Sequence, residues 1–141
     1  MSRLSVLRLF GAATLGAVIG LAGAGPAMAA GPHITAHPDN LMVNTTTKLV
    51  GTGFAPSTSL TVKECANKDW IVPQNPCDST NAVVVTTNKH GSFKTTFTAQ
   101  TCPGTSTGPG FSELCYIGVP TPSGIDTIDL VGAVRITVTG P

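Results

Sequence analysis

The sequence predicts an all-β protein, a seven-stranded immunoglobulin-like Greek-key sandwich or barrel. Thr and Val dominate most segments, and both are stiff at χ1 and favoured in strands. Gly and Pro, 16 and 11 of the 141 residues, break the chain at short intervals, as turns do in sandwiches and barrels. Glu, Lys, Leu and Ala never cluster with helical periodicity.

Each expected strand is a short segment bounded by turn residues. Pro38 closes the first, and the glycine and proline of 53–57 separate the second from the third. Phe93 and Phe97 alternate with polar residues, so one face of their strand is apolar. The segment 88–91 reads as a hairpin turn, with Gly91 free to take a positive φ. The expected strands span 33–37, 46–53, 59–66, 81–87, 92–98, 113–119 and 133–139.

The first 29 residues have the pattern of a secretory signal peptide. Arg3 and Arg8 supply a positive start, 9–24 is almost entirely apolar, and Ala27-Met28-Ala29 is a small-x-small cleavage motif. We expect cleavage after Ala29 and one secreted domain over 30–141. The alternative is an uncleaved membrane anchor, because the apolar run approaches spanning length.

Charge is sparse and balanced. The net charge is +1, two of the eight basic residues lie in the leader, and no basic run occurs. Nucleic-acid binders usually carry a basic face, because phosphate neutralisation supplies much of their affinity. Direct binding to DNA or to an anionic membrane is therefore not expected, and Thr, Ser, Asn and Gly must cover most of the surface.

Four cysteines favour a disulfide framework in an exported chain. Eleven residues separate Cys65 from Cys77 and twelve separate Cys102 from Cys115. We favour pairing within each short loop, which in the chain-entropy model stabilises by about 3 kcal/mol per loop. A bridge from Cys65 to Cys115 across the sandwich stays open as the alternative. The spacings match no zinc ribbon or finger.

Three short motifs follow one another along the chain. They are the VGTGF turn at 50–54, Cys65-Ala66 after the third expected strand, and CYIG at 115–118. With the two closely spaced cysteine pairs, this order resembles the neocarzinostatin family, the secreted apoproteins of enediyne chromoproteins. The likeness extends over nearly all of 30–141.

The resemblance implies a seven-stranded immunoglobulin-like barrel with local disulfides Cys65–Cys77 and Cys102–Cys115. It also implies a monomeric, non-enzymatic carrier whose cleft holds a small aromatic, enediyne-type chromophore without covalent attachment. No other cofactor and no metal are expected. The chromophore, once released, would act on DNA, so DNA is a partner only indirectly, and no membrane contact is expected after signal cleavage.

The resemblance also indicates where ligand contacts would lie. Trp70 is the sole tryptophan and falls in the first cysteine loop, where the family places pocket residues. Tyr116 and Gly118 match two cleft positions after the fourth cysteine, and Gly118 would let a flat ligand approach the backbone. The expected ligand-binding residues are Trp70, Ile71, Val72, Val83, Phe111, Tyr116 and Gly118.

One departure from the family bears directly on the cleft. Family members carry a long segment with aromatic residues before the third cysteine, whereas here only residues 99–101 fill that position. The connection 120–132 is long, and with Phe111 and Ile125 it offers a replacement wall.

The alternative function is a secreted cell-surface structural or interaction module of the same fold with no small-molecule ligand.

Overall fold

The computed structural model describes residues 30–71, 76–104, 108–122 and 127–141. All regular elements within these ranges are strands, so none is a helix that could cross a membrane. The predicted signal peptide lies outside the described residues. The strands are β1 (His33–His37), β2 (Asn40–Met42), β3 (Thr46–Thr52), β4 (Ser59–Cys65), β5 (Asp69–Ile71), β6 (Cys77–Thr86), β7 (Phe93–Thr98), β8 (Ser112–Pro122) and β9 (Thr127–Thr139).

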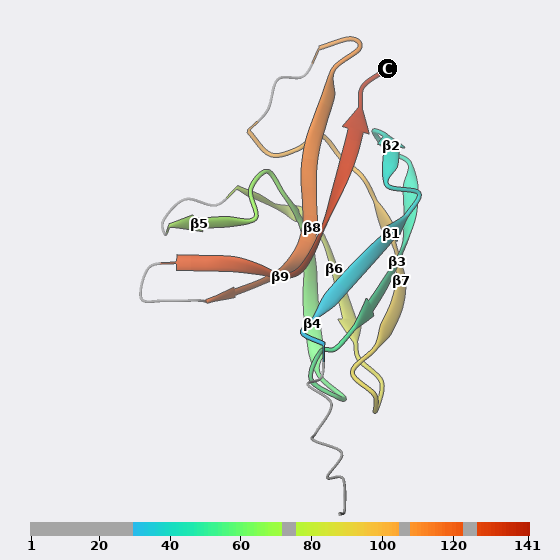
Figure 1. The fold of residues 1–141 in the computed structure, drawn as a ribbon. Helices are drawn as coiled ribbons and strands as arrows, with labels where there is room; N and C mark the ends of the chain where they lie inside the picture. Colours follow the sequence, from blue (N-terminus) through green and yellow to red (C-terminus); the bar gives the residue numbers. More distant parts are fainter. Residues whose placement is uncertain (1–29, 72–75, 105–107, 123–126) are drawn as a thin grey trace, which may run out of the picture.

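The strands form two sheets, which we call the front and back sheets (Figure 1). The front sheet has the order β6-β4-β8-β9 and the back sheet the order β1-β3-β7, both antiparallel. A parallel contact between His33 of β1 and Gly132 of β9 joins them at one edge. The predicted all-β, immunoglobulin-like arrangement of seven strands is confirmed, and the short strands β2 and β5 are additional.

Alternating side chains fill the space between the two sheets. Leu49 and Thr47 on β3 are buried while their neighbours are exposed, as period-two geometry requires. Phe54, Phe93 and Phe97 are all buried, and the rings of Phe54 and Phe93 lie 5.6 Å apart. Each fully buried side chain of this size contributes roughly 1.5–3 kcal/mol to folding.

The turn at 88–91 forms, but it does not make the predicted hairpin. Gly91 has a φ of 71° and donates to the carbonyl of Asn88 at 2.9 Å, as a tight turn requires. The strands it joins, β6 and β7, stand at opposite ends of the sheet order. The turn therefore carries the chain from the front sheet to the back sheet, a choice that turn residues alone do not specify.

The largest difference from the predicted strands lies in the connection expected over 120–132. β8 continues to Pro122 and β9 starts at Thr127, so most of that segment is paired strand. Residues 119–122 of β8, 127–131 of β9 and the whole of β5 form a three-stranded extension, here called the ribbon, which projects from the sandwich (Figure 1).

A β-bulge bends the chain at the base of the ribbon. Ile117 pairs with Val134 and Val119 with Val131, so one residue of β8 faces two of β9. Gly132 occupies the extra position with a φ of 69°, which glycine adopts without steric cost. The bulge turns β8 and β9 away from the front sheet.

The two predicted disulfides are confirmed. Cys65 bonds Cys77, joining β4 to the start of β6, and Cys102 bonds Cys115, joining the loop after β7 to β8. The alternative bridge from Cys65 to Cys115 is therefore excluded. The first bond lies in a small cluster at the base of the ribbon and the second in the main core.

Candidate functional site

The outer face of the front sheet is where the ribbon creates a concave surface. On β4, Val62 is fully buried and Leu60 packs against the core, so the alternating residues Thr61 and Lys63 lie on the outer face. On β8, Tyr116 and Gly118 alternate in the same way with the buried Ile117. The ribbon stands off this face, so the sheet and the ribbon meet at an inside corner (Figure 1).

A groove of about 390 Å³ occupies one side of this corner. Val119 and Pro120, where β8 enters the ribbon, form its apolar wall, and β4 supplies the rest. The lining residues are Ser59, Leu60, Thr61, Lys63, Val119 and Pro120. Since typical small-molecule sites measure 300–1,000 Å³, the groove is at the small end of that range.

Tyr116 lies at the base of the ribbon rather than in the groove lining. It packs against a cluster formed by the Cys65–Cys77 disulfide and Leu130, together with Ile128 and Ala133. In the strand register, Tyr116 stands between Cys65 of β4 and Arg135 of β9. This cluster holds the ribbon against the front sheet.

Gly118 is buried at the bend. A Cβ there would lie 3.0 Å from the Cβ of Leu130 and 3.3 Å from the Cα of Ala133, so the absent side chain makes room for β9. The close backbone approach expected of Gly118 therefore exists, and the protein's own ribbon makes it.

Two of the three residues predicted in the first cysteine loop lie on the ribbon, and the third lies outside the described residues. Trp70 and Ile71 belong to β5, where their backbones pair with Ile128 and Thr127 of β9. The carbonyl of Lys68 accepts a hydrogen bond from Leu130 at 2.7 Å, which extends this pairing. Val72 lies outside the described residues.

Val83 and Phe111 lie apart from the groove. Val83 is partly buried and packs inward against the main core, while its neighbour Val84 is 67% exposed on the outer face. Phe111 precedes β8 at its other end, about 16 Å from Tyr116 at strand spacing. It stacks beside Gly140 and lines a shallow apolar hollow of about 370 Å³ with Gly108, Pro109 and Pro141. Ile125 lies outside the described residues.

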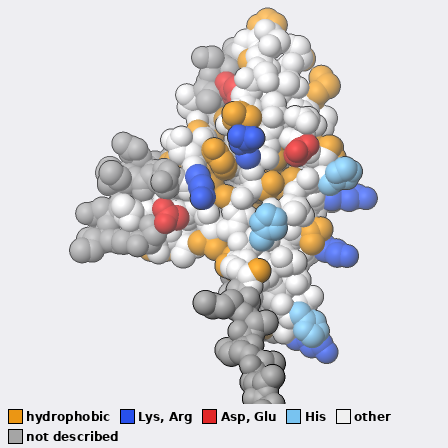
Figure 2. All heavy atoms as spheres, viewed as in Figure 1, with side chains coloured by type: hydrophobic (Ala, Val, Ile, Leu, Met, Phe, Trp, Pro, Cys, Tyr) orange, Lys and Arg blue, Asp and Glu red, His pale blue; other side chains and the backbone are white. Residues whose placement is uncertain are grey.

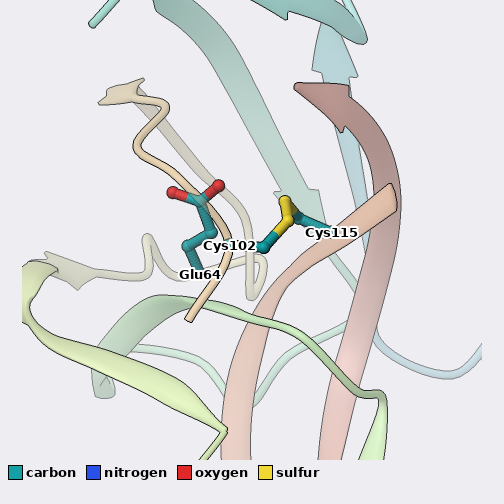
Figure 3. Close-up of side chains that lie close together, drawn as sticks. All are labelled: Glu64, Cys102 and Cys115. Atoms are coloured by element: carbon teal, nitrogen blue, oxygen red, sulfur yellow. A yellow bond between two sulfur atoms is a disulfide. The ribbon is translucent and has the colours of Figure 1, made fainter. Parts of the chain in front are cut away.

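Glu64 is a buried carboxyl group that the sequence analysis missed. Its side chain is 0% exposed and lies between the sheets beside the Cys102–Cys115 disulfide (Figure 3). Its Oε2 accepts hydrogen bonds from the backbone N–H of Gln100 at 2.9 Å and from Nδ2 of Asn81 at 3.4 Å. Its Oε1 has no hydrogen-bond partner among the described residues.

Burial dominates the protonation of this group. Desolvation raises the pKa of Glu64 from its ordinary 4.5 to about 7. The two hydrogen bonds lower this pKa, and a small repulsion from Asp78 raises it. One carboxylate oxygen of Glu64 and the sulfurs of Cys102 and Cys115 lie within 4.8 Å of one another. That set resembles a metal site in composition, but both sulfurs are committed to the disulfide, so it holds no ion in this state.

The alternation of β4 was the available signal for Glu64. Leu60, Val62 and Glu64 occupy every second position, so the same pattern that buries the first two predicts an inward carboxyl group. The donors that satisfy it lie elsewhere in the sequence and no local pattern indicates them.

Charged side chains of the described residues are scattered over the face of the molecule that Figure 2 shows. Figure 2 shows isolated Lys, Arg, Asp and Glu side chains on a face made mostly of uncharged polar side chains and backbone. That face carries no basic patch, in agreement with the composition.

Comparison with known proteins places this fold in a family. A model of the neocarzinostatin family matches residues 34–119. The solved structure of macromomycin is similar, with a TM-score of 0.53 at 21% sequence identity, covering 76% of this chain and 98% of that one. No curated protein of similar sequence was found. The family match ends at Val119, where the ribbon begins. Because it spans more than half of the chain, this protein belongs to the neocarzinostatin family.

Proposed function

We propose that this protein is an exported, non-enzymatic carrier that holds a small aromatic molecule in the groove between β4 and the ribbon. The ligand would be an enediyne-like chromophore bound without covalent attachment and shielded there from water and nucleophiles. DNA would be reached only by a ligand that has left the protein. The carrier would act as a monomer in the extracellular space, where its disulfides persist.

The groove is the observation that carries this proposal. Family membership supports a carrier role, and the groove offers a concave surface of about 390 Å³ with an apolar wall at Val119 and Pro120. The connection before the third cysteine is only three residues long, and the ribbon contributes the second wall through Val119 and Pro120 of β8. The β-bulge at Gly132, where the ribbon leaves the front sheet, sets the angle between the ribbon and that sheet.

Among the predicted contact residues, those on or beside the ribbon suit this site. Trp70 and Ile71 belong to β5, which pairs with β9 in the ribbon, and we keep them as candidate contacts. Val72 is also kept as a candidate and lies outside the described residues. Tyr116 and Gly118 would act indirectly, by seating the ribbon. Val83 packs inward against the main core and Phe111 lines a separate hollow, so we do not assign them to this site.

A neutral fluorescent aromatic tests the proposal. We expect phenylnaphthylamine to bind, to gain fluorescence and to change the emission of Trp70, the sole tryptophan. Thr61→Phe, which fills the groove, should weaken binding by about tenfold. Thr96→Phe is the matched control, because Thr96 is an exposed strand residue of the back sheet. A wild-type protein that binds no aromatic probe, or equal binding by both variants, contradicts the proposal.

A second candidate function rests on the edge of the front sheet. β6 ends the sheet order, and Val84 on its outer face is 67% exposed. An exposed edge strand with an apolar residue is suited to pairing with another chain. If Val84→Lys abolishes retention of the protein on its host cell wall while phenylnaphthylamine fails to bind, the interaction module replaces the carrier.

A further inference from the structure

The charge in the groove lining is positive and comes from one residue. Among its six lining residues Lys63 alone is charged, and Ser59 and Thr61 add hydroxyl groups on the same strand. All three can donate hydrogen bonds to an anion. Lys63 is half-buried on the outer face, opposite Gly118 of β8, so its ammonium belongs to the corner where β4 meets the ribbon.

The charge of Lys63 is only weakly compensated within the protein. Asp78 is the carboxylate that interacts with it, and Lys63 is the smallest of the influences on the pKa of Asp78. That carboxylate is instead held by Thr80, whose hydroxyl and backbone N–H each donate to it at 2.7 Å. Asp78 is therefore already hydrogen-bonded by Thr80, and no carboxylate is seen in an ion pair with Lys63 among the described residues.

We propose that the groove selects aromatic acids, with Lys63 pairing the acidic group and Val119 and Pro120 contacting the ring. This inference rests on the proposed carrier function and adds the ligand class. The acidic group is a carboxylate, sulfonate or ionised phenol, since all three present a negative oxygen to the ammonium. A ligand lacking it would keep the ring contact and lose the ion pair.

Two probes with the same ring system, one anionic and one neutral, distinguish the contribution of the charge to binding from that of the ring. Anilinonaphthalene sulfonate is anionic and phenylnaphthylamine is neutral. We expect the wild-type protein to bind the anion tighter, by up to about fivefold at low salt, as for a partly exposed ion pair. Lys63→Gln should reduce the ratio of the two affinities to about one, and Lys63→Arg should keep it.

The control is Lys94→Gln, which removes an exposed lysine of the back sheet and should leave the ratio unchanged. High salt should lower the ratio, because counter-ions screen the pair. Equal affinities in the wild type, or a ratio that survives Lys63→Gln, overturn the selection of acids while the carrier function stands. If neither probe binds, both ideas fail together.

A second inference comes from the main core and does not depend on the groove. The Glu64 carboxylate and the sulfurs of Cys102 and Cys115 lie within 4.8 Å of one another, and all three residues are almost completely buried. In Figure 3 the carboxyl group and the disulfide lie side by side. A negative charge at this distance disfavours a second one, the more so in a low-dielectric interior.

Reduction of a disulfide must create that second charge. The thiolate of a dithiol attacks one sulfur and bonds to it, the S–S bond breaks, and the other cysteine leaves as a thiolate. The second thiol of the reagent then loses its proton and displaces the first cysteine, so the dithiol ends as a cyclic disulfide. Both cysteine thiolates finally take protons from water. Each departing thiolate would form beside Glu64.

We infer that Glu64 protects the Cys102–Cys115 disulfide from reduction by opposing the departure of a cysteine thiolate. The groups that face Glu64 do not offset this effect. Asn81 of β6 and the backbone N–H of Gln100 are neutral donors, and Asp78 of β6 adds further negative charge. The disulfide Cys65–Cys77 belongs to a separate cluster and serves as the comparison, because Cys65 follows Glu64 on β4 and successive side chains of a strand point to opposite faces.

Glu64→Gln tests this protection, because glutamine keeps an oxygen that accepts from Gln100 and removes the charge. We compare the rate at which dithiothreitol reduces Cys102–Cys115 at pH 8.5 with the rate for Cys65–Cys77 in the same protein, because this ratio removes the effect of Glu64→Gln on the stability of the whole fold. We expect the ratio to be about tenfold higher in the variant. Alkylation followed by peptide mass spectrometry reports each disulfide separately. The difference between variant and wild type should disappear at pH 5, where Glu64 of the wild type is protonated and carries no charge.

Simple loosening of the fold has a different signature. It would accelerate reduction of Cys65–Cys77 together with Cys102–Cys115 and would persist at pH 5. That pattern, or unchanged reduction of Cys102–Cys115 at pH 8.5, overturns the protective role.

Discussion

Glu64 places an ionisable group where its charged form is unfavourable. It is tolerated because the short connection after β7 brings the N–H of Gln100 to its Oε2, and Asn81 bridges the same oxygen to the carbonyl of Thr98. The carboxyl group thereby ties the front sheet to the end of the back sheet. The alternation of β4 indicates that Glu64 points inward, whereas its donors emerge only when the sheets pack.

This burial gives the free energy of unfolding a specific pH dependence. Below pH 4.5 Glu64 is protonated in both states. Between pH 4.5 and about 7 the unfolded chain releases the proton and the folded protein keeps it, so stability falls as pH rises and then levels off. The loss attributable to Glu64 is up to about 3 kcal/mol.

We expect Glu64→Gln to remove this part of the pH dependence. Urea unfolding of wild type and variant at pH 4.5 and pH 8 gives the comparison, with both disulfides intact. The wild type should lose more stability than the variant between the two values. An equal loss in both proteins would show that Glu64 does not titrate in this range.

At the scale of the elements, the ribbon shows where sequence patterns stop being informative. Pro120, Pro122 and Gly132 made 120–132 read as a loop, since proline lacks a donor for sheet pairing. Beyond Gly118 the only described neighbour of β8 is β9, so the prolines lie at an edge where a missing donor costs little. Whether 120–122 forms a strand therefore depends on pairing with β9, and no local residue pattern specifies that pairing.

Gly132 is the position on which the bend depends. Gly132→Ala forces a side chain into the left-handed region, at about 1–2 kcal/mol, and its Cβ would meet the ring of Phe54 at 2.8 Å. Gly110→Ala is the control, with a φ of 74° and open space around its Cβ. We expect the loss of stability on heating to be greater for Gly132→Ala. Equal losses would mean that the bulge is not under packing constraint.

At the scale of the whole molecule, the two disulfides stabilise different regions. Cys102 and Cys115 belong to the main core, so replacing both by alanine should cost about 3–5 kcal/mol, through the cross-link and through lost packing. Replacing Cys65 and Cys77 should cost about 2–3 kcal/mol and loosen the ribbon first. Denaturant unfolding measures both, and hydrogen exchange locates them. Identical exchange patterns in the two variants would contradict this division.

Export is a further property of the entire chain that can be measured directly. The leader predicts cleavage after Ala29, giving a mature protein that begins at Ala30. Intact mass of the protein recovered from the culture medium of its host should match 30–141 with both disulfides formed. A mass that includes the leader would favour the membrane-anchored alternative.

Features that depend on neighbouring residues could be predicted from the amino-acid sequence. Alternation indicated the apolar face of β7, turn residues marked where strands end, and the cysteine spacing together with the family likeness indicated both disulfides. The packed fold alone reveals that β8 and β9 bend at Gly118 and Gly132, that β5 joins them, and that Glu64 finds its donors. These features depend on contacts between residues far apart in the chain, whose free energies exist only once the two sheets have packed.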